Sequence, residues 1–141
     1  MSPTDTIFRQ LETGNPDFSV GLQQVLAQLK WTNDGLIPAV AQQYDTGEVL
    51  MLAWMNAESL RETLQTGQVC YWSRSRKSYW RKGESSGHVQ RLIGMRIDCD
   101  GDSLLLLVDQ AGPACHTNRR SCFYNAVDGD RVKIISAPEK D

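Results

Sequence analysis

The chain has 141 residues, a length that predicts one domain with a hydrophobic core of its own. Apolar residues make up 40% and charged residues 23%, as in ordinary globular proteins, and the formal net charge is −2. This charge excludes a global attraction to nucleic acid or anionic lipid. The longest apolar runs, 49–55 and 104–108, are too short to cross a bilayer, and residues 1–10 lack an apolar signal segment. We therefore expect a cytoplasmic protein without a membrane partner, in which clustered cysteines are more often metal ligands or catalytic groups than disulfides.

The N-terminal part of the chain has little hydrophobic periodicity. Residues 1–20 are predicted to form an N-terminal extension with one helical turn near residues 7–12. From residue 22 to residue 30, apolar side chains recur with helical spacing and predict a helix with one apolar face; they are Leu22, Val25, Leu26 and Leu29. We expect a single domain at 21–136, followed by a frayed tail at 137–141.

The rest of the chain is predicted to form mainly strands. The predicted elements are, in order, strands at 37–44 and 49–55, a helix at 57–66, and strands at 69–73, 88–98, 103–110 and 131–136. Gly47 suits the turn between the first two strands, and Asp100-Gly101 suits another tight turn. Asn56 can cap the start of the helix and Gly67 can end it. The pattern predicts an α+β fold with a mostly antiparallel sheet and a few short helices.

Three cysteines in the C-terminal half have neighbours that are unusual for a core. Cys99, Cys115 and Cys122 are separated by 16 and 7 positions, which is not the paired spacing of a structural zinc ribbon. Three protein ligands would leave one position open for water, as in catalytic zinc sites. Spacing alone leaves metal binding and ordinary burial equally open, whereas Cys70 is expected to fill the core. His116 could be a fourth ligand, a general base or a loop residue.

Acidic residues alternate around the first of these thiols. If the backbone is extended there, Asp98, Asp100 and Asp102 lie on one face and Cys99 on the other. Carboxylate oxygens suit Mg²⁺, and thiolates suit zinc. The residues alone favour the simpler interpretation, in which an aspartate-rich turn closes a hairpin without a metal.

A basic stretch at 74–82 holds five of the 15 Lys and Arg residues, with Tyr79 and Trp80 among them. Such a segment can bind phosphate through its cations and stack on a base through its rings. Residues 82–88 add glycines, hydroxyls, Glu84 and a histidine. A solvated charged loop is the alternative interpretation.

Three segments together resemble the phosphoribosyl-AMP cyclohydrolase family of histidine biosynthesis. They are YWSRSRKSYWRKGESSGHVQRL at 71–92, DCDGDSLLLLVDQAGPACHT at 98–117 and SCFY at 121–124. Each motif alone is weak, but the combination is highly specific, and the likeness extends from about residue 37 to residue 124. With no phosphoribosyl-ATP pyrophosphatase region after residue 141, the resemblance is to the monofunctional form.

The resemblance implies two metal ions per subunit. Cys99, Cys115 and Cys122 would bind one catalytic Zn²⁺, with the first thiol supplied by the partner subunit of an intertwined homodimer. The three aspartates, Asp98, Asp100 and Asp102, would bind one Mg²⁺. The implied reaction is hydrolytic opening of the adenine ring of N1-(5-phosphoribosyl)-AMP between N1 and C6, a small-molecule phosphorylated nucleotide, with no nucleic-acid partner.

The same resemblance suggests roles for other residues. Zinc can lower the pKa of bound water to about 7, and His116 is the expected proton carrier. The expected substrate-binding residues are Arg74, Ser75, Arg76, Trp80, Lys82, Glu84, Ser86, Gly87 and His88. Asn118 stands where the family commonly has glycine, and it tolerates a left-handed backbone.

Two other functions remain open from the residues. A zinc-dependent nucleobase deaminase would carry H-x-E and P-C-x-x-C elements, and this chain has neither. A non-enzymatic zinc module could bind single-stranded RNA through the basic stretch, using Arg74, Arg76, Tyr79 and Trp80, although the negative net charge opposes it.

Overall fold

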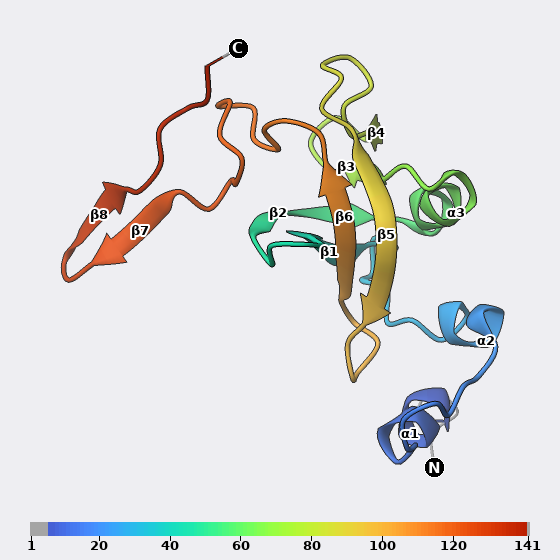
Figure 1. Ribbon diagram of the computed structural model, residues 1–141. Coiled ribbons are helices and arrows are strands. Elements are labelled where there is room, and N and C mark those ends of the chain that lie inside the picture. The colour runs from blue at the N-terminus through green and yellow to red at the C-terminus, as the bar shows by residue number, and fades with distance from the viewer. Residues whose placement is uncertain (1–5, 141) are drawn as a thin grey trace.

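The computed structural model describes residues 6–140, which form a curled sheet with helices at its edge and a separate hairpin (Figure 1). The helices are α1 (Thr6–Glu12), α2 (Leu22–Leu26) and α3 (Ala57–Thr66). The strands are β1 (Ile37–Gln43), β2 (Val49–Met55), β3 (Cys70–Ser73), β4 (Ser78–Arg81), β5 (Gln90–Ile97), β6 (Leu104–Gln110), β7 (Asn125–Asp128) and β8 (Arg131–Ile134). The prediction of an α+β fold with short helices is confirmed.

Strands β1 to β6 form one sheet in the order β4-β3-β2-β1-β6-β5. Every neighbouring pair is antiparallel except β1 and β6, which run parallel. The mostly antiparallel sheet is therefore confirmed. The intertwined homodimer stays a prediction, because the structure describes one chain.

The core lies on one face of this sheet. In β1 and β6 alternate residues are fully or almost fully buried, including Ala39, Ala41, Leu104, Leu106 and Val108. Side chains from the N-terminal segment join the same cluster; they are Ile7, Phe8, Val25 and Leu29. The segment predicted as an extension therefore contributes directly to the core.

Helix α3 begins and ends at the predicted residues. The Asn56 side chain accepts a hydrogen bond from the backbone N–H of Ser59 at 2.8 Å, which satisfies one of the free donors of the first turn. Gly67 ends the helix in the left-handed region, with φ of 75°. Both signals are local, so the sequence was sufficient to place them.

The N-terminal helix prediction at 22–30 is wrong in length. Helix α2 ends at Leu26 because the backbone leaves the helix to make a long-range contact. The N–H of Lys30 donates to the carbonyl of Gly101 at 2.8 Å instead of continuing the helical pattern.

Two strands lie where no strand was predicted. Strand β4 falls within the basic stretch, whose many cations concealed a short exposed strand that pairs with β3. Strand β7 pairs with β8 as a hairpin, and β8 ends at Ile134 rather than at residue 136. The predicted fraying of the tail does not hold at Glu139, whose N–H donates to the carbonyl of Asn118 at 2.7 Å.

The β7–β8 hairpin stands apart from the six-stranded sheet (Figure 1). Val127 and Val132 are cross-strand partners and are 80% and 64% exposed, and Ile134 on the same face is 56% exposed. A two-stranded hairpin is at best marginally stable alone in water. Exposed apolar side chains gathered on one face are typical of interaction surfaces.

Candidate active site: a thiol pair in a basic pocket

A pocket of about 610 Å³ lies where β4, the loop after it and the loop after β6 meet. It is lined by Met51, Arg76, Tyr79, Trp80, Arg81, Lys82, Gly83, Glu84, Ser85, Ser86, His88, Pro113, Ala114, Cys115, His116, Asn118 and Cys122. This volume suits a small-molecule ligand. Its cations outnumber its single carboxylate, which favours an anionic ligand.

Two of the three predicted thiols meet in this pocket. The loop between them folds back on itself, because the N–H of Cys115 donates to the carbonyl of Arg119 at 3.0 Å. Asn118 makes the turn with φ of 66°, a left-handed conformation that asparagine tolerates. The N–H of Cys122 donates to the carbonyl of Leu50 at 2.7 Å, which fixes the second thiol against β2.

The two thiols have pKa values that are shifted in opposite directions. Burial would raise the pKa of Cys115, but hydrogen bonds from Thr117 and the nearby Lys82 ammonium lower it. Burial and the charge on Cys115 raise the pKa of Cys122 to about 11. The pair therefore ionises first at Cys115 and retains the proton of Cys122, a proton that a bound cation would replace.

Lys82 connects the two loops that form the pocket. Its Nζ donates to the carbonyl of Ala114, the residue before the first thiol, and lies 4.9 Å from the centre of the Trp80 ring. Burial lowers the pKa of Lys82, although the neighbouring thiols oppose that shift. The ammonium therefore stands beside the thiol pair as well as facing the pocket.

Two residues beside Cys115 complete the local arrangement. The Thr117 hydroxyl donates to the Cys115 sulfur at 3.1 Å. His116 lines the pocket and is exposed, so its imidazole can reach a ligand there. Thr117 is a contact that the sequence analysis missed, and its only local signal is a hydroxyl two positions after a thiol.

The predicted substrate-binding residues divide between two places. Six line the pocket, namely Arg76, Trp80, Lys82, Glu84, Ser86 and His88. Arg74, Ser75 and Gly87 are not among its lining residues. The Arg74 guanidinium lies 4.6 Å from the centre of the Trp54 ring instead.

Close backbone contacts hold the glycine-rich loop in place. Gly83 has φ of 81°, and a Cβ on it would lie 2.3 Å from the backbone carbon of His88. The Gln110 side-chain amide donates to the carbonyl of His88 at 3.0 Å. The His88 ring lies against Gly112, where an added Cβ would come within 2.8 Å. These contacts tie the loop after β4 to the loop that carries Cys115.

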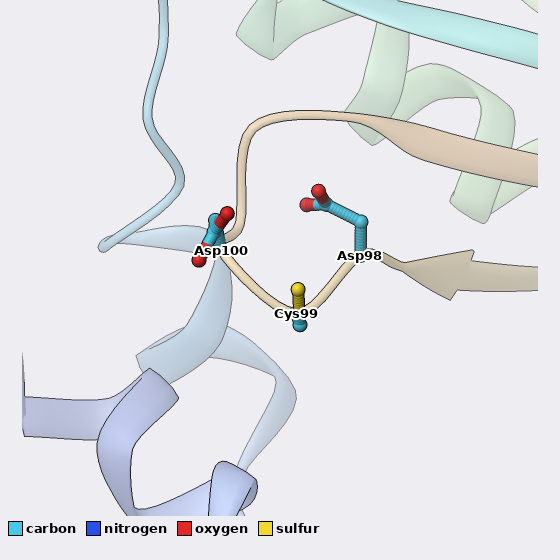
Figure 2. A group of neighbouring side chains, drawn as sticks. All are labelled: Asp98, Cys99 and Asp100. Carbon is cyan, nitrogen blue, oxygen red and sulfur yellow. The ribbon is translucent and has the colours of Figure 1, made fainter.

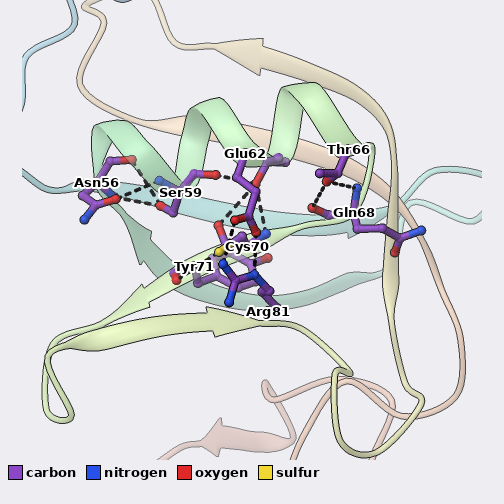
Figure 3. A network of polar contacts seen from close by, with 9 residues as sticks. Asn56, Ser59, Glu62, Thr66, Gln68, Cys70, Tyr71 and Arg81 are labelled. Carbon is purple, nitrogen blue, oxygen red and sulfur yellow. Dashed lines mark hydrogen bonds and ion pairs between the residues drawn. The ribbon is translucent and has the colours of Figure 1, made fainter.

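Strand β4 is held on the side of α3 by an ion pair (Figure 3). The Arg81 guanidinium donates to both carboxylate oxygens of Glu62, each at 2.8 Å. Cys70 lies fully buried beside this pair, and burial raises its pKa to about 11. Cys70 therefore fills the core, as predicted, and does not join the thiol pair.

The acidic turn between β5 and β6 gathers Asp98, Cys99 and Asp100 (Figure 2). One potential ligand atom from each lies within 4.8 Å of the others. The backbone turns here and is not extended, so the expected separation of carboxylates and thiol onto opposite faces is wrong. Asp98 Oδ1 accepts hydrogen bonds from the N–H groups of Asp102, at 2.8 Å, and Ser103, at 3.2 Å, which fold the turn back on itself.

The pKa values of Asp98 and Asp102 are shifted in opposite directions in this turn. Burial would raise the pKa of Asp98, but hydrogen bonds from Asp102 and Ser103 lower it. The hydrogen bond with Asp98 raises the pKa of Asp102. A bound cation would offset the repulsion between these neighbouring carboxylates.

Cys99 does not reach the thiol pair within one chain. It is exposed in the turn before β6, whereas Cys115 and Cys122 lie in the loop that follows β6 (Figure 1). The seven residues of β6 separate these two ends by about 20 Å. Within a single chain, the structure brings together two of the three predicted zinc ligands.

The described part of the chain, residues 6–140, contains no helix that combines the length and apolar character needed to span a bilayer.

Comparisons with known proteins agree with these features. The family model for phosphoribosyl-AMP cyclohydrolase matches residues 51–124, which include both thiols of the pair, the basic pocket and the acidic turn. A phosphoribosyl-AMP cyclohydrolase of Alkalilimnicola ehrlichii is 64% identical over 135 residues, covering 96% of this chain and 95% of the relative. Phosphoribosyl-AMP cyclohydrolase 2 of Pseudomonas fluorescens is 67% identical over 120 residues, covering 85% and 82%. The corresponding protein of Hydrogenovibrio crunogenus is 59% identical over 131 residues, covering 93% and 89%. With this identity over nearly its whole length, the chain belongs to the phosphoribosyl-AMP cyclohydrolase family.

Proposed function

We propose that this enzyme hydrolyses N1-(5-phosphoribosyl)-AMP at the N1–C6 bond of its adenine ring, in the histidine pathway of the cytoplasm. The family and the names of its relatives support this substrate. Water oxygen adds to C6, the N1–C6 bond breaks, and a proton is delivered to N1, so that C6 becomes the carbon of a carboxamide. The family assignment favours this reaction over nucleobase deamination and over RNA binding.

One observation carries the proposal: two neighbouring thiols, one with a lowered and one with a raised pKa, line a basic pocket of nucleotide size. Thiolates are preferred zinc ligands, and each must lose its proton to bind the metal. The cations of the pocket are suited to the phosphates of the substrate. Neither feature alone indicates this reaction, but together they support a proposed metal site beside a proposed phosphate site.

The donor set fits zinc only if a further ligand joins the pair. We propose that Cys99 of the partner subunit supplies it, which makes the active unit a homodimer with one zinc ion per subunit. The exposed thiol of Cys99 and the uncovered apolar face of the β7–β8 hairpin support this arrangement. When bound, zinc supplies Lewis acidity and lowers the pKa of its water ligand to about 7.

The acidic turn fits a hard divalent cation. Asp98, Asp100 and Asp102 are proposed to hold one Mg²⁺ per subunit, because oxygen donors suit this ion. The raised pKa of Asp102, to which the hydrogen bond with Asp98 and then the charges of Asp98 and Asp100 contribute, supports a cation among these carboxylates. Because Cys99 belongs to the same turn, one segment would serve both ions.

The chain's own residues account for substrate orientation and proton transfer. Arg76 and Lys82 are proposed to bind phosphate, and Trp80 to stack on the base. His116 is proposed to move the proton that ends on N1, because it is exposed to the pocket and adjacent to Cys115. Arg74 and Ser75 are proposed to contact the substrate's outer part, together with Gly87.

The direct test compares two cysteine variants. Cys115→Ser is expected to lose most of its zinc and to lose ring opening, which is followed by ultraviolet absorbance of the nucleotide. Cys70→Ala is the control, since Cys70 is buried away from the pocket, and it should retain zinc and activity wherever it folds. Full activity of a zinc-free Cys115→Ser protein would contradict the proposal.

A further inference from the structure

We propose that the N-terminal helix α1 positions the acidic turn, with Phe8 acting as a clamp on Gly101. This inference rests on the proposed function, because it assigns a task to the turn that would hold Mg²⁺ and present Cys99. It gives the N-terminal segment a role in the active site of the partner subunit as well as in the core.

The contact between Phe8 and Gly101 is unusually close. A Cβ placed on Gly101 would lie 2.3 Å from Cζ of the Phe8 ring and 2.5 Å from Cε2. The ring therefore rests directly against the α-carbon of the glycine. Gly101 also has φ of 74°, a conformation that larger residues rarely adopt. Both the ring and the missing side chain are required for this contact.

A second contact holds the same residue from its carbonyl. The Gly101 carbonyl accepts the Lys30 N–H at 2.8 Å, just after α2. The two N-terminal contacts are themselves linked, because the Ile7 N–H donates to the Gln28 side chain at 3.3 Å. Segment 6–30 thus contacts Gly101 twice, through the Phe8 ring and through the Lys30 N–H.

Gly101 lies at the centre of the turn's own hydrogen bonds. Its N–H donates to the carbonyl of Asp98 at 3.1 Å, and the next two N–H groups donate to the Asp98 carboxylate. A displacement of Gly101 would therefore change the orientation of the Asp98 carboxylate. Because Cys99 is in the same turn, its thiol would move as well. We infer that Phe8 is a positioning residue for both proposed ligand sets.

An ordinary core role is the competing explanation, because Phe8 is only 8% exposed. The chain offers a matched control in Phe18, whose ring also lies against a glycine of the N-terminal segment. A Cβ on Gly14 would lie 2.7 Å from that ring, yet Phe18 is 51% exposed and has no contact of this kind with the acidic turn. Phe8→Leu keeps an apolar side chain in the core while it removes the flat ring.

The experiment compares wild type, Phe8→Leu, Phe8→Ala and Phe18→Leu as full-length proteins. Amide hydrogen exchange is measured at Asp102 and Ser103, with β6 amides as the reference for global stability. Zinc and Mg²⁺ affinities are measured on the same proteins by titration of the metal-free form. Phe8→Leu is expected to exchange faster at these two amides with unchanged β6 protection, and to bind the ions about tenfold more weakly or worse. Phe18→Leu should match wild type.

Equal exchange at Asp102 and Ser103 in Phe8→Leu and wild type would overturn the clamp, and so would equal affinities despite faster exchange. If Phe8→Ala unfolds, Phe8→Leu decides the question alone. Failure of the wild-type protein to bind either ion would instead contradict the proposed function. The two failures are therefore distinguishable.

Discussion

The two thiols of the pocket differ because their surroundings differ. Cys115 receives a hydrogen bond from the Thr117 hydroxyl at 3.1 Å, whereas Cys122 is affected mainly by burial and by the charge on Cys115. Consequently one thiol favours the thiolate, whereas the pKa of the other is raised to about 11. The pKa of each thiol is thus set by the groups next to its sulfur.

This difference predicts a pH-dependent zinc affinity. Cys122 is protonated in the metal-free protein at neutral pH, so each zinc ion that binds must release its proton. The affinity should rise with pH, by about tenfold per unit for that one proton, and fall as the pH falls. Chelator competition between about pH 6.5 and 8.5 measures the slope. A pH-independent zinc affinity would contradict the predicted protonation of the pair. In Cys122→Ser, the number of protons released per zinc ion, read from the slope of log affinity against pH, should fall by one.

At the scale of elements, local signals were reliable and long-range contacts were not predictable. Helix α3 begins after Asn56 and ends at Gly67, as predicted, because helix caps depend on neighbouring residues. The end of α2 depends on the hydrogen bond from Lys30 to Gly101, which is 71 positions away and leaves no local pattern. Strand β4 was concealed because it lies within the basic stretch and its one charged residue, Arg81, pairs with Glu62 rather than entering the core.

The β7–β8 hairpin gives a prediction about assembly. Val127 and Val132 are direct cross-strand partners, so Val127→Lys with Val132→Glu replaces the apolar surface while it allows an ion pair that preserves the hairpin. We expect the double variant to be monomeric in sedimentation analysis and to lose activity, because Cys99 would no longer meet a partner's thiol pair. A variant that remains dimeric would show that the hairpin is not the dimer contact, and an active monomer would contradict the shared site.

For the whole molecule, motifs indicated which residues matter but not how they are grouped. The family resemblance named the three thiols, and the structure puts Cys115 and Cys122 in the pocket with Lys82 against Ala114. It leaves Cys99 at the far end of β6, a separation that follows from strand length and topology. Spacing along the sequence carries no such information. The proposed three-thiol site therefore requires Cys99 from a second copy of the chain.

The most direct test of this shared site is subunit complementation. Cys99→Ser and Cys115→Ser proteins are each expected to be inactive, and mixing them under conditions that exchange subunits should restore activity. The mixed dimer holds one intact set, with Cys115 and Cys122 from one subunit and Cys99 from the other. Random exchange should therefore give about a quarter of wild-type activity, with zinc regained in proportion. A mixture that exchanges subunits but stays inactive would contradict the shared site.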